Sequence, residues 1–181
     1  MTDTAAAPPS IVFDVSGHTM ALPAAAVVRV LPLPRLDRLP ASPPVIAGLF
    51  RYGAALVPVL HLDVLLGLPA ALPDLYRPLL LCRRPGGLVA YLCGRVTGLV
   101  TPPCLTPMPQ SNGAMVPLSF NRCVTGRFEH GGAACLLLDP ARLLTAAEDQ
   151  SLEAHRRIAE ERATVWADAA VWVNGTAEDA P

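Results

Sequence analysis

The residues that could act chemically are few and scattered along the chain. His61 and Asp63 stand two positions apart and could offer two metal ligands, but one such pair is far short of a full ligand set. Ser119 has no base nearby in the sequence. The chain also lacks a Gly-x-Ser-x-Gly elbow, a phosphate-binding loop and a Gly-x-Gly-x-x-Gly fingerprint. We therefore predict no metal, no cofactor and no enzymatic activity.

The cysteines point to packing rather than chemistry. There are 5 of them, an odd number, and no two form a Cys-x-x-Cys pair. This spacing predicts neither a zinc site nor a disulfide framework. Most have apolar neighbours, as in Leu81-Cys82 and Cys135-Leu136, so we expect reduced, buried thiols that behave as small hydrophobic side chains.

Composition limits the classes of partner. The 181 residues are 52% hydrophobic and 16% charged, with a net charge of −1, which gives no long-range field to attract nucleic acid or an anionic membrane. The first ten residues lack the basic and apolar regions of a signal peptide, and no apolar run is long enough to span a bilayer. We expect a cytoplasmic protein that neither binds nucleic acid nor inserts into a membrane.

The elements that would position these residues are mostly short strands. Ile11 to Val15 and 18–22 alternate in polarity on either side of the tight turn Ser16-Gly17, which is typical of a hairpin. Further strands are expected at 26–31, 56–62, 79–82, 88–92, 95–100, 124–128 and 134–138. Many short strands punctuated by Gly and Pro favour a mainly β fold, either a sandwich or barrels.

Residues 48–67 combine several signals. They predict a tight loop, then a strand in which Pro58 requires a bulge or an open edge, then one helical turn. Asp63 and Asp139 each follow an apolar strand and are expected to cap a short helix, with Pro140 in the first turn of the second one. This repetition of an apolar strand followed by Asp and a short helix indicates two similar halves, each closed by a helical turn.

The carboxy-terminal segment differs in character. Thr145 and Glu148 have the spacing of a capping box, and an amphipathic helix is expected over 147–174. Its apolar residues near one face are Ile158, Val165, Trp166, Ala169 and Trp172. This face either docks onto the rest of the chain, or it recruits a partner or dimerises. We expect the ends, 1–9 and 175–181, to be disordered.

Over residues 10–146 the order of short motifs resembles that of the chemotaxis coupling protein CheW family. The matching residues are Phe13, Val15, Gly17, Leu22-Pro23, Val27, Val30, Pro44-Val45, Gly48, Pro58-Val59, Leu66-Gly67-Leu68, Arg95-Val96, Gly98-Leu99-Val100, Leu137-Leu138-Asp139 and Leu143-Leu144. The resemblance implies two intertwined five-stranded SH3-like barrels with short capping helices and a groove between them. We expect the first half at about 10–70 and the second at about 76–146.

The resemblance also implies a non-enzymatic adaptor that couples the cytoplasmic tip of methyl-accepting chemoreceptors to the regulatory domain of a CheA-type histidine kinase. Receptors would then recruit it to the inner face of the membrane. On this reading the partner-binding residues are Arg29, Val45, Ile46, Gly48, Leu49, Arg51, Tyr52, Gly53 and Pro58.

The chain departs from the family pattern at these positions. The usual Asn-Leu-Arg-Gly falls on residues 51–54, so Gly53 replaces the arginine, and Arg29 replaces an acidic residue. The family aspartate after Pro-Val falls on His61. Either Arg51 and Tyr52 provide a new contact, or receptor binding is altered or lost.

Two alternatives remain. A repurposed adaptor would serve another complex through the Trp-bearing helix. A small β-barrel enzyme or ligand-binding protein would need carboxylates that meet in space, and a closed polar pocket would favour it.

Overall fold

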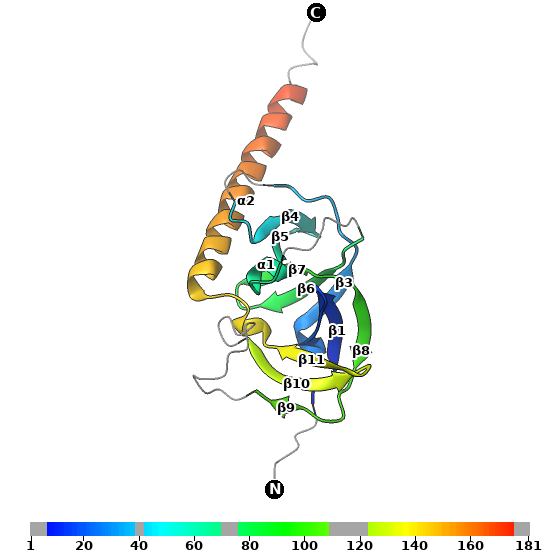
Figure 1. The fold of residues 1–181 in the computed structure, drawn as a ribbon. Helices are drawn as coiled ribbons and strands as arrows, with labels where there is room; N and C mark the ends of the chain where they lie inside the picture. Colours follow the sequence, from blue (N-terminus) through cyan, green and yellow to red (C-terminus); the bar gives the residue numbers. More distant parts are fainter. Residues whose placement is uncertain (1–6, 39–41, 70–75, 109–122, 176–181) are drawn as a thin grey trace, which may run out of the picture.

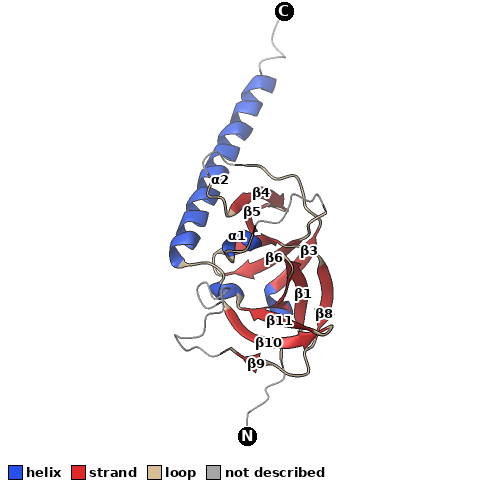
Figure 2. Cartoon of the chain, viewed as in Figure 1, coloured by secondary structure: helices blue, strands red, loops and turns tan. Residues whose placement is uncertain are grey.

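The computed structural model describes residues 7–38, 42–69, 76–108 and 123–175. In this part of the chain two β-sheets form the body, and α2 (Ala146–Gly175) rises along its side as one long helix (Figure 1). Strands dominate the body, whereas α2 accounts for most of the helical ribbon (Figure 2). Among the described residues, no helix combines the length and apolar character needed to cross a membrane.

The first sheet has the strand order β8-β1-β2-β11-β10-β9. Its strands are β1 (Ser10–Val15), β2 (His18–Pro23), β8 (Val96–Val100), β9 (Thr106–Pro107), β10 (Val124–His130) and β11 (Ala133–Leu138). The hairpin β1–β2 forms as expected, with Ser16 and Gly17 at φ of 50° and 83° in its turn. The sheet has six strands instead of the expected five because the two-residue β9 pairs with β10.

The second sheet has the order β3-β6-β7-β5-β4. Its strands are β3 (Val27–Leu31), β4 (Ile46–Tyr52), β5 (Ala55–His61), β6 (Leu79–Arg84) and β7 (Gly87–Leu92). The short helices η1 (Ala24–Ala26), α1 (Leu62–Leu65) and η3 (Pro140–Arg142) connect or close strands. β3 and β4 are the edges of this sheet, and β8 and β9 are the edges of the first one.

The two sheets interleave along the chain. β1 and β2 join strands that come after residue 95, whereas the second sheet takes the middle strands β3 to β7. In the first sheet, a parallel pairing of β2 with β11 joins the start of the chain to its end. In the second sheet, β5 pairs in parallel with β7. The boundary between the sheets therefore does not follow the expected halves 10–70 and 76–146, because β1 and β2 belong with the end of the chain.

Each strand sends alternate side chains into different cores, as the pleat requires. Phe13 and Met20 enter a cluster that both sheets share, whereas their neighbours Val12 and Ala21 enter a cluster inside the first sheet. In the second sheet Leu80 joins the shared cluster, while the residues on either side of it join a third cluster. Burial on both faces explains why several strands are apolar at almost every position.

Local signals at helix ends are confirmed. The Glu148 backbone N–H donates to Thr145 Oγ1 at 3.3 Å, and the Thr145 N–H donates to Glu148 Oε2 at 2.8 Å, which is the expected capping box. Asp139 Oδ1 accepts from the Ala141 N–H at 2.9 Å and caps η3. The helix expected over 147–174 is α2.

The expected loop at Gly48 is instead strand β4. Gly48 has a φ of 153° beside an irregularity in the β4–β5 register, and Leu49 exchanges two backbone hydrogen bonds of 2.8 Å with Asp37. A Cβ at Gly48 would lie 2.9 Å from the Asp37 carbonyl oxygen. The glycine therefore permits a close chain crossing rather than a turn.

Of the ends expected to be disordered, residues 1–6 and 176–181 lie outside the described part. Ala7 is only 4% exposed, and the Ala24 N–H donates to the Pro9 carbonyl at 2.8 Å. Ala7 is thus buried and Pro9 is hydrogen-bonded to the body, which corrects the expectation that 1–9 is disordered as a whole.

Candidate functional site

The His61–Asp63 pair is part of a buried electrostatic contact. Asp63 is 1% exposed, and its Oδ2 lies 3.3 Å from Nη2 of Arg77, which is 7% exposed. Arg77 Nε also donates to the Cys93 carbonyl at 3.2 Å, so the pair fastens α1 to the end of β7. The expectation that Asp63 caps a helix is wrong, because His61 occupies the N-cap position of α1 and Asp63 lies in its first turn.

His61 is half-buried next to the Asp63 carboxylate. Its Nδ1 lies 3.9 Å from Asp63 Oδ1, and burial lowers its pKa from the usual 6.5, outweighing the opposite effect of Asp63. Within the described residues, no group of three or more His, Cys, Asp or Glu side chains is placed to hold a metal ion. The Asp63 carboxylate is already paired with the guanidinium of Arg77.

The thiols are buried with one exception. Cys82, Cys93, Cys123 and Cys135 are buried and free, whereas Cys104 is free and exposed. Burial raises the pKa of Cys82 and Cys93 to about 12 and that of Cys135 to about 11. Protonated thiols in apolar surroundings are poor nucleophiles, so these residues act in packing.

An exposed apolar surface lies on the edges of both sheets. Val28 and Val30 on β3 are 41% and 40% exposed, and Leu99 on β8 is 63% exposed. We call these three residues the edge patch. Both strands are at sheet edges, which leaves one side of each backbone unpaired within its sheet.

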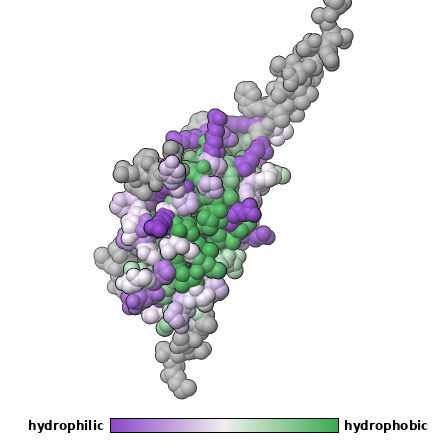
Figure 3. All heavy atoms as spheres, turned by 90° about the vertical axis from the view of Figure 1, so that its right-hand side faces the viewer, coloured by the Kyte–Doolittle hydropathy of each residue, from purple (hydrophilic) through white to green (hydrophobic). Residues whose placement is uncertain are grey.

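Register shows that two residues of the edge patch, Val30 and Leu99, continue the shared core. Val30 pairs with Leu80, and Leu99 pairs with Ile11, and both of these partners pack in the shared cluster. Opposite residues of an antiparallel pair project from the same face. Figure 3 shows apolar atoms gathered on the side where β3 and β8 lie in Figure 1, with hydrophilic residues around them.

Arg29 lies between the two exposed valines. It is exposed on β3, and among the described residues no acidic side chain forms an ion pair with it. Arg29 was expected to bind a partner on the basis of the family resemblance, whereas Val28, Val30 and Leu99 were not among the expected docking residues. The alternation of a strand with apolar residues beside an exposed arginine could have identified them, but only pairing shows that β3 and β8 are edges.

The other expected docking residues lie around the β4–β5 hairpin. Gly53, with φ 61°, forms the tip with Ala54, and Arg51 and Gly53 are exposed there. The remaining ones are Tyr52, Val45 and Ile46, which are half-buried, and Gly48, Leu49 and Pro58, which are buried. The structure therefore divides the set into an exposed tip and a supporting core.

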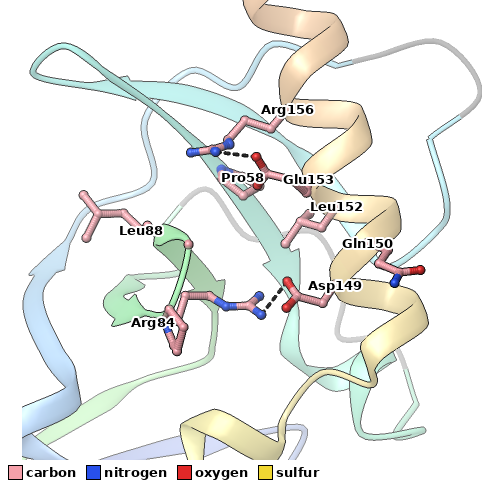
Figure 4. A pocket seen from close by; sticks show the side chains of 11 residues that line it. Pro58, Arg84, Leu88, Asp149, Gln150, Leu152, Glu153 and Arg156 are labelled. Carbon is pink, nitrogen blue, oxygen red and sulfur yellow. Dashed lines mark hydrogen bonds and ion pairs between the residues drawn. The ribbon is translucent and has the colours of Figure 1, made fainter.

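Pro58 lies next to the helix contact. Pairing of β5 with β7 begins at Val59, so Pro58 is outside that ladder although β5 is an interior strand, and its missing N–H interrupts no hydrogen bond there. Together with Leu88 and Leu152 it lines a cavity of about 260 Å³ between α2 and the β6–β7 turn (Figure 4).

Helix α2 is fastened to the body by its first turns. Leu152 is 6% exposed and belongs to the shared cluster. Arg84 Nη2 lies 2.5 Å from Asp149 Oδ1, and Arg156 pairs with Glu153 within the helix (Figure 4). Of these two ion pairs, only Arg84–Asp149 links the helix to the body, since Arg156 and Glu153 both belong to α2.

The later turns of α2 extend beyond the sheets (Figure 1). Ile158 is 41% exposed, so at this position the expected apolar face is uncovered. The side chains of Val165, Trp166, Ala169 and Trp172 lie outside what the structure describes.

Comparison with known proteins identifies the barrel region. A family model described as CheW-like domain matches residues 9–148. No curated protein sequence gives a significant match. Among solved structures, the chain is similar to the crystal structure of the scaffolding protein TtCheW from Thermoanaerobacter tengcongensis, with a TM-score of 0.64 and 15% identity over 76% of this chain and 92% of that chain.

These matches confirm the expected mainly β fold of two SH3-like barrels. At 15% identity the structural likeness concerns the fold alone. The family match ends at residue 148, so nearly all of α2 lies beyond it.

Proposed function

Because this chain belongs to the CheW-like domain family, whose members are non-catalytic chemotaxis scaffolds, we propose that it is an adaptor that couples chemoreceptors to a CheA-type histidine kinase. One barrel surface would dock the regulatory domain of the kinase, and another the cytoplasmic tip of a methyl-accepting chemoreceptor. The observation that supports this proposal best is the edge patch, an apolar surface on two unpaired strand edges.

The physics of the edge patch suits protein docking. Three large apolar side chains between polar neighbours provide anchors that a partner can desolvate, and anchors of this kind dominate interface energies. Their direct support by the shared core holds them in place before binding, which reduces the entropy lost on association. We assign the receptor tip to the edge patch and the kinase domain to the β4–β5 hairpin tip at Arg51 to Gly53.

In this proposal the adaptor acts in the cytoplasm, at the inner face of the membrane where receptors hold it. The unit that docks is the barrel pair of residues 10–146. Each contact is expected to bind in the micromolar range typical of small transient interfaces.

The test is binding of the purified chain to the cytoplasmic fragment of a receptor and to the kinase regulatory domain from the same organism. Val30→Asp should weaken receptor binding at least about tenfold, since it places a charge in the desolvated patch. Ala154→Asp, on an exposed position of α2, is the matched control and should bind like the wild type. The proposal is rejected if the wild-type chain binds neither protein.

A second candidate function is favoured by α2, which lies beyond the family match and projects past the barrels. Here the chain would serve another complex through the helix. Deletion after Arg157 separates the two, because kinase and receptor binding should survive it whereas recruitment through the helix should not.

A further inference from the structure

The molecule presents two apolar surfaces that its described residues leave uncovered. One is the edge patch, and the other begins at Ile158 on α2, which is 41% exposed. The sequence repeats an apolar residue at intervals of seven from Ile158 to Val165 and Trp172. Such spacing is typical of a helix that places one seam against a partner.

The seam does not coincide with the side of α2 that packs on the body. Leu152 marks that side, since it is buried in the shared cluster. Ile158 follows six residues later, and at about 100° per residue it is rotated about 120° from Leu152 around the helix axis. Ile158 therefore lies on a face of α2 that is directed away from its own barrels. The spacing of seven in the sequence places positions 165 and 172 on the same face of the helix.

The edge patch is also out of reach of the helix in the same molecule. In Figure 1, α2 runs along the side opposite β3 and β8, and its later turns extend past the end of the body. An uncovered helix face and an uncovered apolar strip thus occur on opposite sides of one chain. Docking of the helix of one molecule on the strip of another removes both surfaces from water.

The distribution of charged residues also favours contact between the helix and the edge patch. Arg29 and Arg95, at the edge strands, are exposed and have no ion-pair partner among the residues the structure describes. In the sequence, Glu161 and Asp168 each follow a seam residue by three positions and so flank the seam on one side. Glu161 pairs loosely with Arg157 at 3.8 Å, and both side chains are largely exposed, so this contact is easily exchanged.

We propose that the free part of α2 from one molecule docks on the edge patch of a second copy of this chain. Each such contact uses different surfaces on the two molecules and leaves one patch and one helix free, so association continues head to tail into chains or rings. The proposal shares the edge patch with the proposed receptor contact. Self-association would therefore compete with receptor binding and fall when receptors are abundant.

The experiment is a complementation test by sedimentation. Val30→Asp removes the patch and keeps the helix, whereas deletion after Arg157 removes the free helix and keeps the patch. The wild type should associate increasingly from about 1 μM to about 500 μM, the range of weak interfaces. Each variant alone should stay monomeric, and an equimolar mixture of the two should form a one-to-one dimer that stops there.

Three results would overturn the proposal. One is a wild-type chain that stays monomeric throughout this range. Another is association of Val30→Asp with itself, which would indicate helix–helix pairing. The third is a mixture that remains monomeric although both variants are folded by circular dichroism. Ile158→Asp, at a surface position, replaces the deletion if truncation affects folding, and it should complement Val30→Asp in the same way.

Receptor binding by the chain deleted after Arg157 separates this proposal from the proposed function. If that chain binds the receptor fragment but the complementation fails, only self-docking is rejected. If complementation succeeds and no receptor binds, the adaptor role is rejected and self-docking stands. With both correct, the deleted chain should bind the receptor fragment several-fold more tightly than the wild type at high protein concentration, because no helix from a second copy competes for the edge patch.

Discussion

Breaking the Asp63–Arg77 pair should destabilise the barrels strongly. The carboxylate is 1% exposed and the guanidinium 7% exposed, with 3.3 Å between Oδ2 and Nη2. Removing one partner leaves a buried charge without its counter-ion, which costs about 3–5 kcal/mol. Domains of this size are stable by only about 5–15 kcal/mol, so either single substitution removes a large fraction of the stability.

The substitutions can be chosen to isolate the charge. Asp63→Asn keeps an oxygen that can accept the 2.9 Å hydrogen bond from the Val64 N–H, and Arg77→Met keeps most of the side-chain volume. With a urea m-value of about 2 kcal/mol/M, a loss of 3 kcal/mol lowers the midpoint of unfolding by about 1.5 M. Urea titrations followed by circular dichroism measure this shift for each variant.

A double-mutant cycle completes the measurement. The double variant has neither charge, so it should lose clearly less stability than the sum of the single variants. Arg157→Met is the control, since its pair with Glu161 is 74% and 69% exposed and should be worth under about 1 kcal/mol. Additive single effects, or a loss below about 1 kcal/mol for Arg77→Met, would refute the reasoning.

Three further predictions concern α2, the thiols and pH. Leu152→Ala should lower the unfolding free energy by about 2–5 kcal/mol, whereas Ile158→Ala should change it by less than about 1 kcal/mol, as thermal melts would show. Ellman's reagent at pH 8 should modify Cys104 rapidly and the four buried cysteines only as the chain unfolds, and rapid modification of a second thiol would contradict their burial. His61 has a folded pKa below its unfolded value of about 6.5, so the unfolded chain binds the proton first and stability should fall as pH drops from 7 to 5. His61→Gln should reduce that fall, and an unchanged pH profile would exclude a contribution from His61.

What the sequence predicted correctly depends on neighbours along the chain. The Ser16-Gly17 turn, the capping box of Thr145 and Glu148, and the Asp139 cap each involve contacts within four residues. Their side chains satisfy nearby backbone groups whatever the rest of the molecule does. The same reasoning located most strands, because the alternation of apolar and polar residues follows from the pleat of each strand.

What it missed depends on contacts between distant segments. Asp63 was expected to cap a helix because the sequence does not show that its partner is Arg77, which lies fourteen positions later. Gly48 looked like a loop residue because its close neighbour is the carbonyl of Asp37. The edge patch escaped notice for a related reason, since Val28 and Val30 would read as core residues on any strand that had partners on both sides.

The way α2 joins the body decides how its role can be tested. Leu152 belongs to the cluster that both barrels share, and a Cβ at Gly87 would lie 3.3 Å from Arg156 Nη1, so the helix is in close contact up to Arg156. A deletion after Gln150 would remove Leu152 and open a void next to the side chains that support both sheets. Any loss of binding would then report damage to the barrels. A deletion after Arg157 leaves this packing intact and removes only turns that project beyond it, so a change in binding can be assigned to the helix itself.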